Sequence, residues 1–248
     1  MRRFFTEPQN ISGDTACIFE DSAHIKKVLR MEAGDEILIF DGTGHEYTAS
    51  LTSIEKDKCE ARIIDKRISL SEPKVKVWLF QGLPKTGKME TIIQKAVELG
   101  VYEIVPVMMD RCVVRINNPE AGKEKSRRWN KVSLEAVKQC GRGIIPKVHE
   151  PVDFETAVSM LKELEIAMMP YEELGHAGKN GLREVLDSGA DAQSIGILVG
   201  PEGGFSDPEA ELAAEKGLSM IGLGKRILRT ETVASAMIPI IMFYRNEI

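Results

Sequence analysis

The sequence predicts a small β-rich region followed by an α/β domain with a mostly parallel sheet. Within residues 1–70, short β-prone runs are separated by tight turn signals, which is typical of a small barrel. From residue 75 onward, strand-like apolar runs alternate with segments of helical period, which indicates parallel strands covered by helices on both faces. Residues 69–73 form the expected linker between these two parts.

The elements follow from the same patterns, taken in chain order. In the first part the expected strands are 36–41, 47–54 and 59–64, with turns at DGTG (41–44) and EKDK (55–58). In the second part the expected strands are 75–80, 104–107, 165–169, 195–199 and 220–223. The expected helices are 88–99, 123–139, 154–164, 206–216 and 232–244.

Composition narrows the class of protein. Of the 248 residues 43% are hydrophobic and 29% charged, which favours a soluble globular fold over a disordered chain. The four cysteines lie far apart, so neither a disulfide framework nor a zinc site is expected. No apolar signal segment follows the basic N-terminus, and the longest apolar run, 233–244, is too short to span a bilayer. We expect a cytoplasmic protein with no membrane and no metal.

Charge is unevenly distributed along the chain. The net charge is −5, yet residues 111–150 hold ten Lys or Arg against four Glu. Residues 153–221 hold four basic against fourteen acidic residues. The basic stretch fits an RNA-binding surface, and a solvated helix face explains it equally well.

Residues 82–88 fit the phosphate-loop pattern GxxxxGK between a strand and a helix. The next residue is Met89, where such a loop needs a hydroxyl for Mg²⁺. Pro84 also removes one backbone donor. A basic strand-to-helix turn is therefore the favoured interpretation, and a P-loop-like nucleotide-binding protein is the alternative.

A glycine-rich loop, GPEGG at 200–204, follows a predicted strand and precedes a helix. Ser206 and Glu209 have the spacing of a capping box. Glu202 disfavours an anion in this loop, which instead suits close backbone approach to a neutral or cationic ligand. An ordinary strand–turn–helix connection is the alternative.

A second glycine pair, Gly222 and Gly224, is weak evidence for a dinucleotide site, since Ile227 replaces the third glycine. Just before the last helix, Thr230 is a candidate N-cap and Glu231 suits the N-terminal helix dipole.

Five segments resemble the RsmE family of bacterial enzymes, which methylate N3 of a uridine in small-subunit ribosomal RNA. They are RRFF at 2–5, QKAVELGV at 94–101, EAVKQCGR at 135–142, GPEGGFS at 200–206 and LGKRILRTETVAS at 223–235. The resemblance implies a PUA-like or OB-like β-barrel over residues 1–70. It implies a SPOUT-type parallel-sheet domain over residues 74–248, with a C-terminal trefoil knot.

The resemblance also implies S-adenosylmethionine as cofactor, held by three loops that each follow a strand. The expected cofactor-binding residues are Met169, Pro170, Val199, Gly200, Pro201, Glu202, Gly203, Leu223, Gly224, Ile227, Leu228 and Arg229. Ligand binding at the carboxyl ends of parallel strands agrees with this set.

Methylation at N3 requires an unpaired uracil and loss of the N3 proton. Arg229 offers planar donors to the uracil carbonyl oxygens, and Glu231 is the candidate general base, with helix capping as its alternative role. Arg142 is the third catalytic candidate, expected to reach the RNA across a dimer. The expected RNA contacts are Arg2, Arg3, His24, Lys27, Arg30, Lys88, Lys95 and Arg142, and His24 has a structural role as an equal alternative.

The predicted partners are small-subunit ribosomal RNA, within the assembled 30S subunit, and a second copy of the chain. Residues 233–244 are apolar nearly all round, which predicts a helix buried on more than one side. A homodimer explains this pattern, and an internal helix in a monomer is the alternative. A non-catalytic RNA-binding protein is the remaining alternative function.

Overall fold

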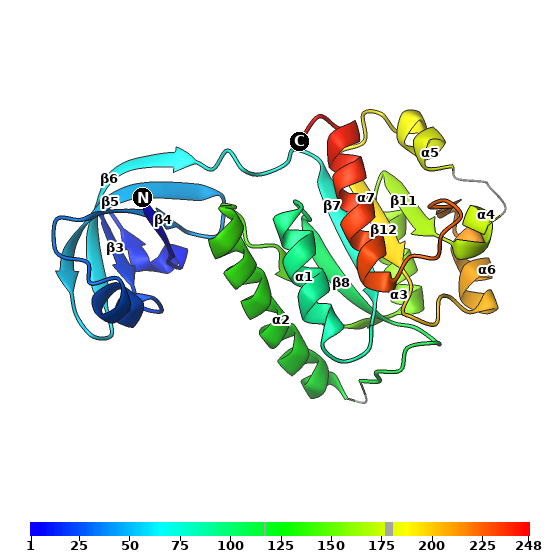
Figure 1. The fold of residues 1–248 in the computed structure, drawn as a ribbon, viewed down its shortest axis with the longest axis horizontal. Coiled ribbons are helices and arrows are strands. Elements are labelled where there is room, and N and C mark those ends of the chain that lie inside the picture. The colour runs from blue at the N-terminus through cyan, green and yellow to red at the C-terminus, as the bar shows by residue number, and fades with distance from the viewer. Residues whose placement is uncertain (117, 177–180) are drawn as a thin grey trace. The chain divides into compact units, whose positions relative to one another are not determined.

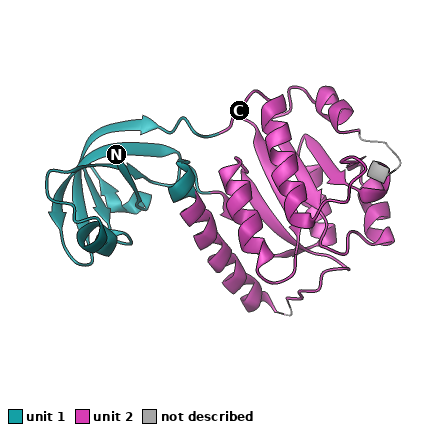
Figure 2. Cartoon of the chain, in the orientation of Figure 1, with its two compact units in different colours: residues 1–72, 137–145 teal, residues 73–136, 146–248 magenta. Residues whose placement is uncertain are grey.

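Two β-sheets organise the chain, one in each of two compact units (Figures 1 and 2). The computed structural model describes residues 1–116, 118–176 and 181–248. Unit 1 contains residues 1–72 and 137–145, and unit 2 contains residues 73–136 and 146–248.

Unit 1 is built on a six-stranded sheet with the order β1-β4-β5-β6-β3-β2. Its strands are β1 (Arg2–Phe5), β2 (Ile11–Ser12), β3 (Thr15–Ile18), β4 (Glu36–Phe40), β5 (His45–Ile54) and β6 (Cys59–Ile68). Only β1 and β4 pair in parallel, and β1 and β2 lie at the two edges. Two short helical turns, η1 (Pro8–Asn10) and η2 (His24–Val28), complete the unit. Alternate strand residues such as Phe4, Ile18 and Ile39 form its buried core.

Segment 137–145 belongs to unit 1 through a carboxylate in the predicted linker. Glu72 accepts hydrogen bonds from the Arg142 guanidinium at 2.8 Å and from the N–H groups of Gly143 and Ile144 at 2.8 and 3.1 Å. A partly buried carboxylate is tolerated when donors satisfy its oxygens. Part of the predicted linker is therefore held firmly within unit 1.

Unit 2 is built on a parallel sheet with the order β10-β8-β7-β12-β11-β13, and β9 pairs with β8. Its strands are β7 (Lys76–Gly82), β8 (Glu103–Met108), β9 (Lys147–Val148), β10 (Val152–Asp153), β11 (Ile166–Pro170), β12 (Ser194–Val199) and β13 (Ser219–Ile221). Strands β7, β8, β11 and β12 are central and almost wholly buried, as continuous apolar runs predict.

Helices cover both faces of this sheet. Helices α1 (Lys88–Glu98) and α7 (Thr230–Tyr244) lie side by side on one face, and α3 (Phe154–Lys162) lies on the other (Figure 1). Gly196 of β12 permits the close approach of α3, because a Cβ there would lie 2.4 Å from Leu161. The remaining helices are α2 (Pro119–Cys140), α4 (Glu172–His176), α5 (Leu182–Ser188) and α6 (Asp207–Glu215).

The predicted order of elements is confirmed, with differences at the short elements. Strands β1, β2, β3, β9 and β10 and helices α4 and α5 were not predicted. The predicted strand 220–223 ends at Ile221, so Leu223 lies in the following loop. Among the described helices none is long and apolar enough to cross a membrane.

Candidate functional site

Three loops at the carboxyl edge of the unit 2 sheet enclose a pocket of about 600 Å³. They follow β11, β12 and β13, strands that lie side by side in parallel, so their carboxyl ends meet. The lining residues are Lys88, Arg111, Pro170, Tyr171, Glu172, Glu173, Val199, Gly200, Pro201, Glu202, Gly203, Gly204, Phe205, Asp207, Leu223, Gly224, Arg226, Ile227, Leu228, Arg229, Thr230 and Val233.

The loop after β12 is shaped by its glycines and by the helix that follows. Gly204 has a φ of +69°, in the left-handed region that favours glycine. A Cβ on Gly203 would lie 2.9 Å from the Cβ of Arg111, and Arg111 Nη1 donates to the Gly203 carbonyl at 3.2 Å. The predicted capping box of α6 is confirmed, with reciprocal bonds between Ser206 and Glu209. The loop is therefore closely fitted to its neighbours.

Thr230 ties the loop after β12 to the start of α7. Its hydroxyl donates to the Gly200 carbonyl at 2.7 Å and accepts from the buried Gln81 side chain at 2.8 Å. The prediction that Thr230 caps α7 is wrong, because the N-cap is Arg229 and the hydroxyl is used within the pocket wall. Glu231 lies in the first turn of α7, as predicted.

Lys88 joins two carboxylates at the pocket. Its ammonium lies 3.3 Å from Glu202 and 3.1 Å from Glu231, and Glu202 also accepts from the Lys85 N–H at 3.1 Å. The hydrogen bond to Glu231 is the main cause that raises the pKa of Lys88. Burial by itself raises the pKa of Glu202, but backbone N–H groups and Lys88 outweigh it and lower that pKa. Backbone hydrogen bonding, followed by Lys88, lowers the pKa of Glu231, so all three groups are charged at neutral pH.

These contacts decide the interpretation of residues 82–88. The Lys88 ammonium and the Lys85 N–H are both engaged by carboxylates of the same chain, and Met89 is buried. A Cβ on Gly82 would lie 2.7 Å from the backbone of Pro201, which leaves no room for a phosphate against this glycine. The favoured strand-to-helix turn is what the structure shows.

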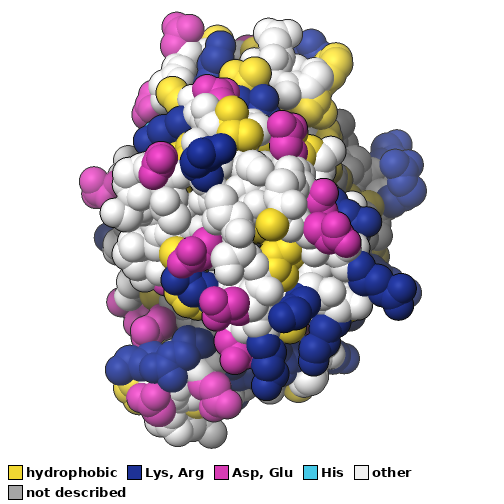
Figure 3. Space-filling view, turned by 90° about the vertical axis from the view of Figure 1, so that its left-hand side faces the viewer, with side chains coloured by type: hydrophobic (Ala, Val, Ile, Leu, Met, Phe, Trp, Pro, Cys, Tyr) yellow, Lys and Arg dark blue, Asp and Glu magenta, His cyan; other side chains and the backbone are white. Residues whose placement is uncertain are grey.

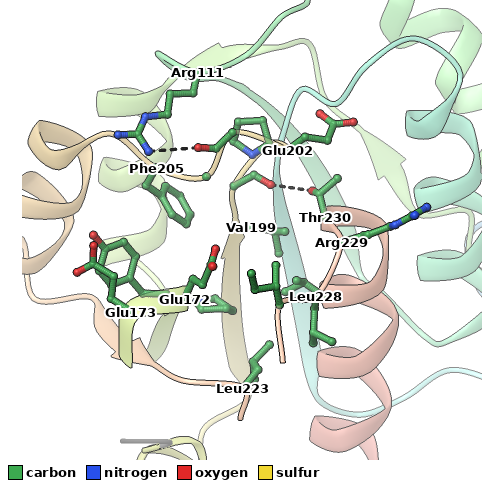
Figure 4. Close-up of a pocket in the computed structure, with 18 of the residues that line it drawn as sticks. Arg111, Glu172, Glu173, Val199, Glu202, Phe205, Leu223, Leu228, Arg229 and Thr230 are labelled. Carbon is green, nitrogen blue, oxygen red and sulfur yellow. Dashed lines mark hydrogen bonds between the residues drawn. The ribbon is translucent and has the colours of Figure 1, made fainter. Parts of the chain in front are cut away.

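The pocket combines an apolar wall with charges of both signs. Val199, Leu223 and Leu228 lie together at its centre, while Glu172 and Glu173 lie on the side of the β11 loop (Figure 4). Arg229 extends from the start of α7 and points away from Val199 (Figure 4). Such a surface suits a ligand that has a flat apolar part and both positive and negative groups.

The predicted cofactor-binding residues come together as expected, with one exception. All of them line the pocket except Met169, which is fully buried. The lining residues that are not among the twelve expected ones are Lys88, Arg111, Tyr171, Glu172, Glu173, Gly204, Phe205, Asp207, Arg226, Thr230 and Val233. Arg111 follows β8 and Glu172 follows β11, so the edge rule for parallel strands could have found both residues.

The predicted RNA contacts fall into two groups. Arg2, His24, Lys27 and Arg30 are exposed on unit 1, which disfavours a buried structural role for His24. Arg3 instead pairs with Glu46 at 3.1 Å, and its side chain is 12% exposed. Lys95 is exposed and pairs with Glu98 of the same helix. The face in Figure 3 shows Lys and Arg interspersed with Asp and Glu rather than gathered in one uniform patch.

Arg142 differs from its predicted role. It is 5% exposed, and its guanidinium is bound to Glu72 within unit 1. A side chain buried and neutralised in this way is not presented to an RNA or to a second active site. Arg142 is thus part of the internal structure of unit 1, and its expected catalytic and RNA-binding role stays a prediction.

Comparison with known proteins agrees with the two units and the pocket. Residues 71–242 match the family described as RNA methyltransferase domain, and residues 20–64 match the RNA methyltransferase PUA domain. The Bacillus subtilis ribosomal RNA small subunit methyltransferase E is 34% identical over 94% of this chain and 92% of its own length.

Two solved structures resemble the chain over nearly its whole length. Ribosomal RNA small subunit methyltransferase E from Neisseria gonorrhoeae, bound to S-adenosyl methionine, has a TM-score of 0.85 and 32% identity, covering 98% of this chain and 97% of its own. A putative methyltransferase from Legionella pneumophila, in complex with the same cofactor, has a TM-score of 0.85 and 30% identity, covering 97% and 96%. The fold and the site therefore define an RNA methyltransferase with an N-terminal PUA-like domain and a SPOUT-like sheet. Within that class, the chain belongs to the RsmE family, the ribosomal RNA small subunit methyltransferases E.

Proposed function

We propose that this chain transfers a methyl group from S-adenosylmethionine to N3 of a uridine in small-subunit ribosomal RNA, with the assembled 30S subunit as substrate. The observation that carries the proposal is the three-loop pocket at the carboxyl edge of the sheet. Relatives of similar length include enzymes whose names give the small-subunit RNA as substrate and a structure that holds the cofactor.

The residues of the pocket fit this cofactor. Val199, Leu223 and Leu228 offer apolar contacts to an adenine, and the glycine loops expose backbone groups to its edge. Acidic and basic side chains on the lining, such as Glu172 and Arg111, suit the amino and carboxylate groups of a methionine moiety. When bound, the cofactor supplies an electrophilic methyl group on a sulfonium. We propose that all twelve cofactor-binding residues expected from the sequence contribute to this site. Met169 is fully buried and would support the neighbouring lining residues.

The chain's own residues have to orient the uracil and accept the N3 proton. Arg229 is exposed at the N-cap of α7 and has donors suited to the uracil carbonyl oxygens. Glu231 is the proposed base, and its ion pair with Lys88 keeps the carboxylate deprotonated, although it also lowers its basicity. Arg229 lines the pocket, and Glu231 pairs with Lys88, which lines it as well.

The RNA contacts are proposed on unit 1, as a PUA-like RNA-binding domain over residues 1–70, with residues 74–248 as the methyltransferase domain. Arg2, His24, Lys27 and Arg30 are exposed there and are suited to phosphate contacts. Lys95 of α1 is a further proposed contact. A cytoplasmic location follows from the ribosomal substrate.

We further propose a homodimer and a knotted C-terminal segment. One side of α7 is buried in the chain, whereas Ile240 is 42% exposed and Phe243 72% exposed. Exposed apolar side chains on one helix are typical of an interface. The knot would be formed by the segment that carries β13 and α7, whose Thr230 contacts both Gly200 and Gln81.

The test combines two measurements. Mass spectrometry of small-subunit RNA from a deletion strain should reveal one missing methyluridine, restored by the wild-type gene. Purified protein should transfer labelled methyl from S-adenosylmethionine to 30S subunits better than to naked RNA, and Arg229→Ala should lose turnover more than cofactor affinity. RNA binding without methyl transfer, or Mg²⁺-dependent ATP binding, would contradict the proposal.

A further inference from the structure

Lys88 is the only group described in the structure that contacts a carboxylate of the loop after β12 and a carboxylate of the first turn of α7 at once. Its ammonium bridges Glu202, in the loop after β12, and Glu231, in the first turn of α7, at 3.3 and 3.1 Å. The three side chains are 34%, 23% and 26% exposed, so water only partly screens them. The sequence by itself predicts an RNA contact for Lys88.

A hydrogen bond between uncharged groups also connects the loop after β12 to the start of α7. Thr230 Oγ1 donates to the Gly200 carbonyl in the pocket wall and is almost fully buried. The ion pairs of Lys88 form a second connection between the same two segments, nearer the solvent. The backbone N–H of Lys85 also donates to Glu202, which extends the connection to the turn before α1.

The positive charge of Lys88 offsets the two negative charges of Glu202 and Glu231. Without its ammonium, Glu202 and Glu231 would remain as two neighbouring carboxylates with no shared cation, and like charges at close range repel. The two loops would then separate or lose order. Binding a ligand to disordered loops costs the free energy of ordering them, whereas loops ordered in advance avoid this cost.

We propose that Lys88 is a positioning residue. Its bridge between Glu202 and Glu231 orders the loop after β12 and the loop that leads into α7, and it fixes Glu231 beside the reacting uracil. The inference rests on the proposed methyltransferase function for its second part. The first part concerns the loops themselves and holds without a bound cofactor. An RNA phosphate contact for Lys88 is the competing role.

The test uses Lys88→Met and Lys88→Arg, with Lys95→Met as a matched control. Lys95 lies on the same helix, but its ion pair with Glu98 stays within that helix. Hydrogen exchange of the protein without cofactor should be faster in residues 200–204 and 229–232 of Lys88→Met, and unchanged in Lys95→Met. Calorimetry with S-adenosylhomocysteine should show roughly tenfold weaker binding in Lys88→Met, the equivalent of about 1.4 kcal/mol, with most of the loss restored in Lys88→Arg.

The double variant Glu231→Gln/Lys88→Met should lose less binding free energy for S-adenosylhomocysteine than the sum of the two single variants, because both substitutions remove the same bridge. Unchanged exchange and unchanged cofactor affinity in Lys88→Met, with only a higher KM for the RNA substrate, would overturn the proposal and favour the phosphate contact. Wild-type protein that binds no S-adenosylhomocysteine would overturn the proposed function instead, and the exchange data would still decide the bridge.

Discussion

The hydroxyl of Thr230 lies 2.7 Å from the carbonyl oxygen of Gly200, although 30 positions separate the two residues in the sequence. The bond joins the first residue of α7 to the glycine that follows β12. It is one of the contacts that hold the pocket walls together before any ligand binds.

Replacing Thr230 with Val should destabilise the pocket wall. The change keeps the shape but leaves the Gly200 carbonyl and the buried Gln81 amide without this partner, which costs about 1–3 kcal/mol. Urea denaturation followed by tryptophan fluorescence reports on unit 2, which holds both Trp78 and Trp129. Thr232→Val, an exposed position on the same helix, should be close to neutral, and equal effects in both variants would contradict the assignment.

Replacing Gly203 with Val should abolish cofactor binding while the fold is retained. The new side chain would meet Arg111, whose Cβ would lie 2.9 Å from the added Cβ. The loop must shift to relieve this overlap, and the pocket changes shape. Gly122→Ala is the control, because a Cβ there has only ordinary contacts at 3.6 Å or more. Calorimetry should show cofactor heat in the control and none in Gly203→Val.

Substitutions at Arg142 and Lys27 should affect different properties, protein stability in the first case and RNA binding in the second. Arg142→Met leaves the partly buried Glu72 carboxylate without its cation, which costs at most about 3 kcal/mol of stability. Lys27→Met should leave stability unchanged and flatten the salt dependence of RNA binding by roughly 0.7 in slope. A stable Arg142→Met variant with a flattened salt slope would return Arg142 to the RNA surface.

Unit 1 should lose a defined part of its stability in acid through Asp41. Burial alone raises the pKa of Asp41, but hydrogen bonds from Thr43, His45 and Tyr47 outweigh it and lower the pKa below the ordinary 3.8. A lowered native pKa means that this stabilisation is complete above pH 3.8 and is lost as the pH falls through the native value. The exchange-derived stability of β4 and β5 should differ between wild type and Asp41→Asn at pH 7, and the two should converge below pH 3.8. A difference that stays constant with pH would refute this.

The proposed dimer predicts a mass of about twice 27.5 kDa by light scattering. Phe243→Asp places a charge on the exposed apolar side of α7 and should give a folded monomer with reduced activity. Phe19→Asp, at an exposed position of unit 1, should remain dimeric. A fully active wild-type monomer would rule out a site shared between subunits.

Local patterns were sufficient to predict the main strands of the unit 2 sheet, whereas the loops of the pocket were expected from the family resemblance. Continuous apolar strands identified β7, β8, β11 and β12, and the edge rule for parallel strands agrees with the three loops that the resemblance implied. The short strands β2 and β10 have two residues each, too few for a periodic signal.

Long-range ion pairs could not be predicted in the same way. Lys88 and Glu231 are 143 positions apart, and Arg142 and Glu72 are 70 apart, so no local spacing connects them. The sequence shows a basic residue in a basic stretch, and only the fold shows whether a carboxylate lies against it. For this reason the apolar and glycine-rich parts of the site were predicted better than its charged parts.

The attachment of segment 137–145 to unit 1 has a consequence for biosynthesis. A nascent chain that has just emerged up to residue 72 lacks Arg142 and the two amides that satisfy the Glu72 carboxylate. The N-terminal unit can therefore be completed only after β7, β8 and α2 have left the ribosome, even though most of its strands are made first. Translation order and folding order differ in this protein, and a fragment ended at the apparent domain boundary would be an unfinished unit rather than an independent one.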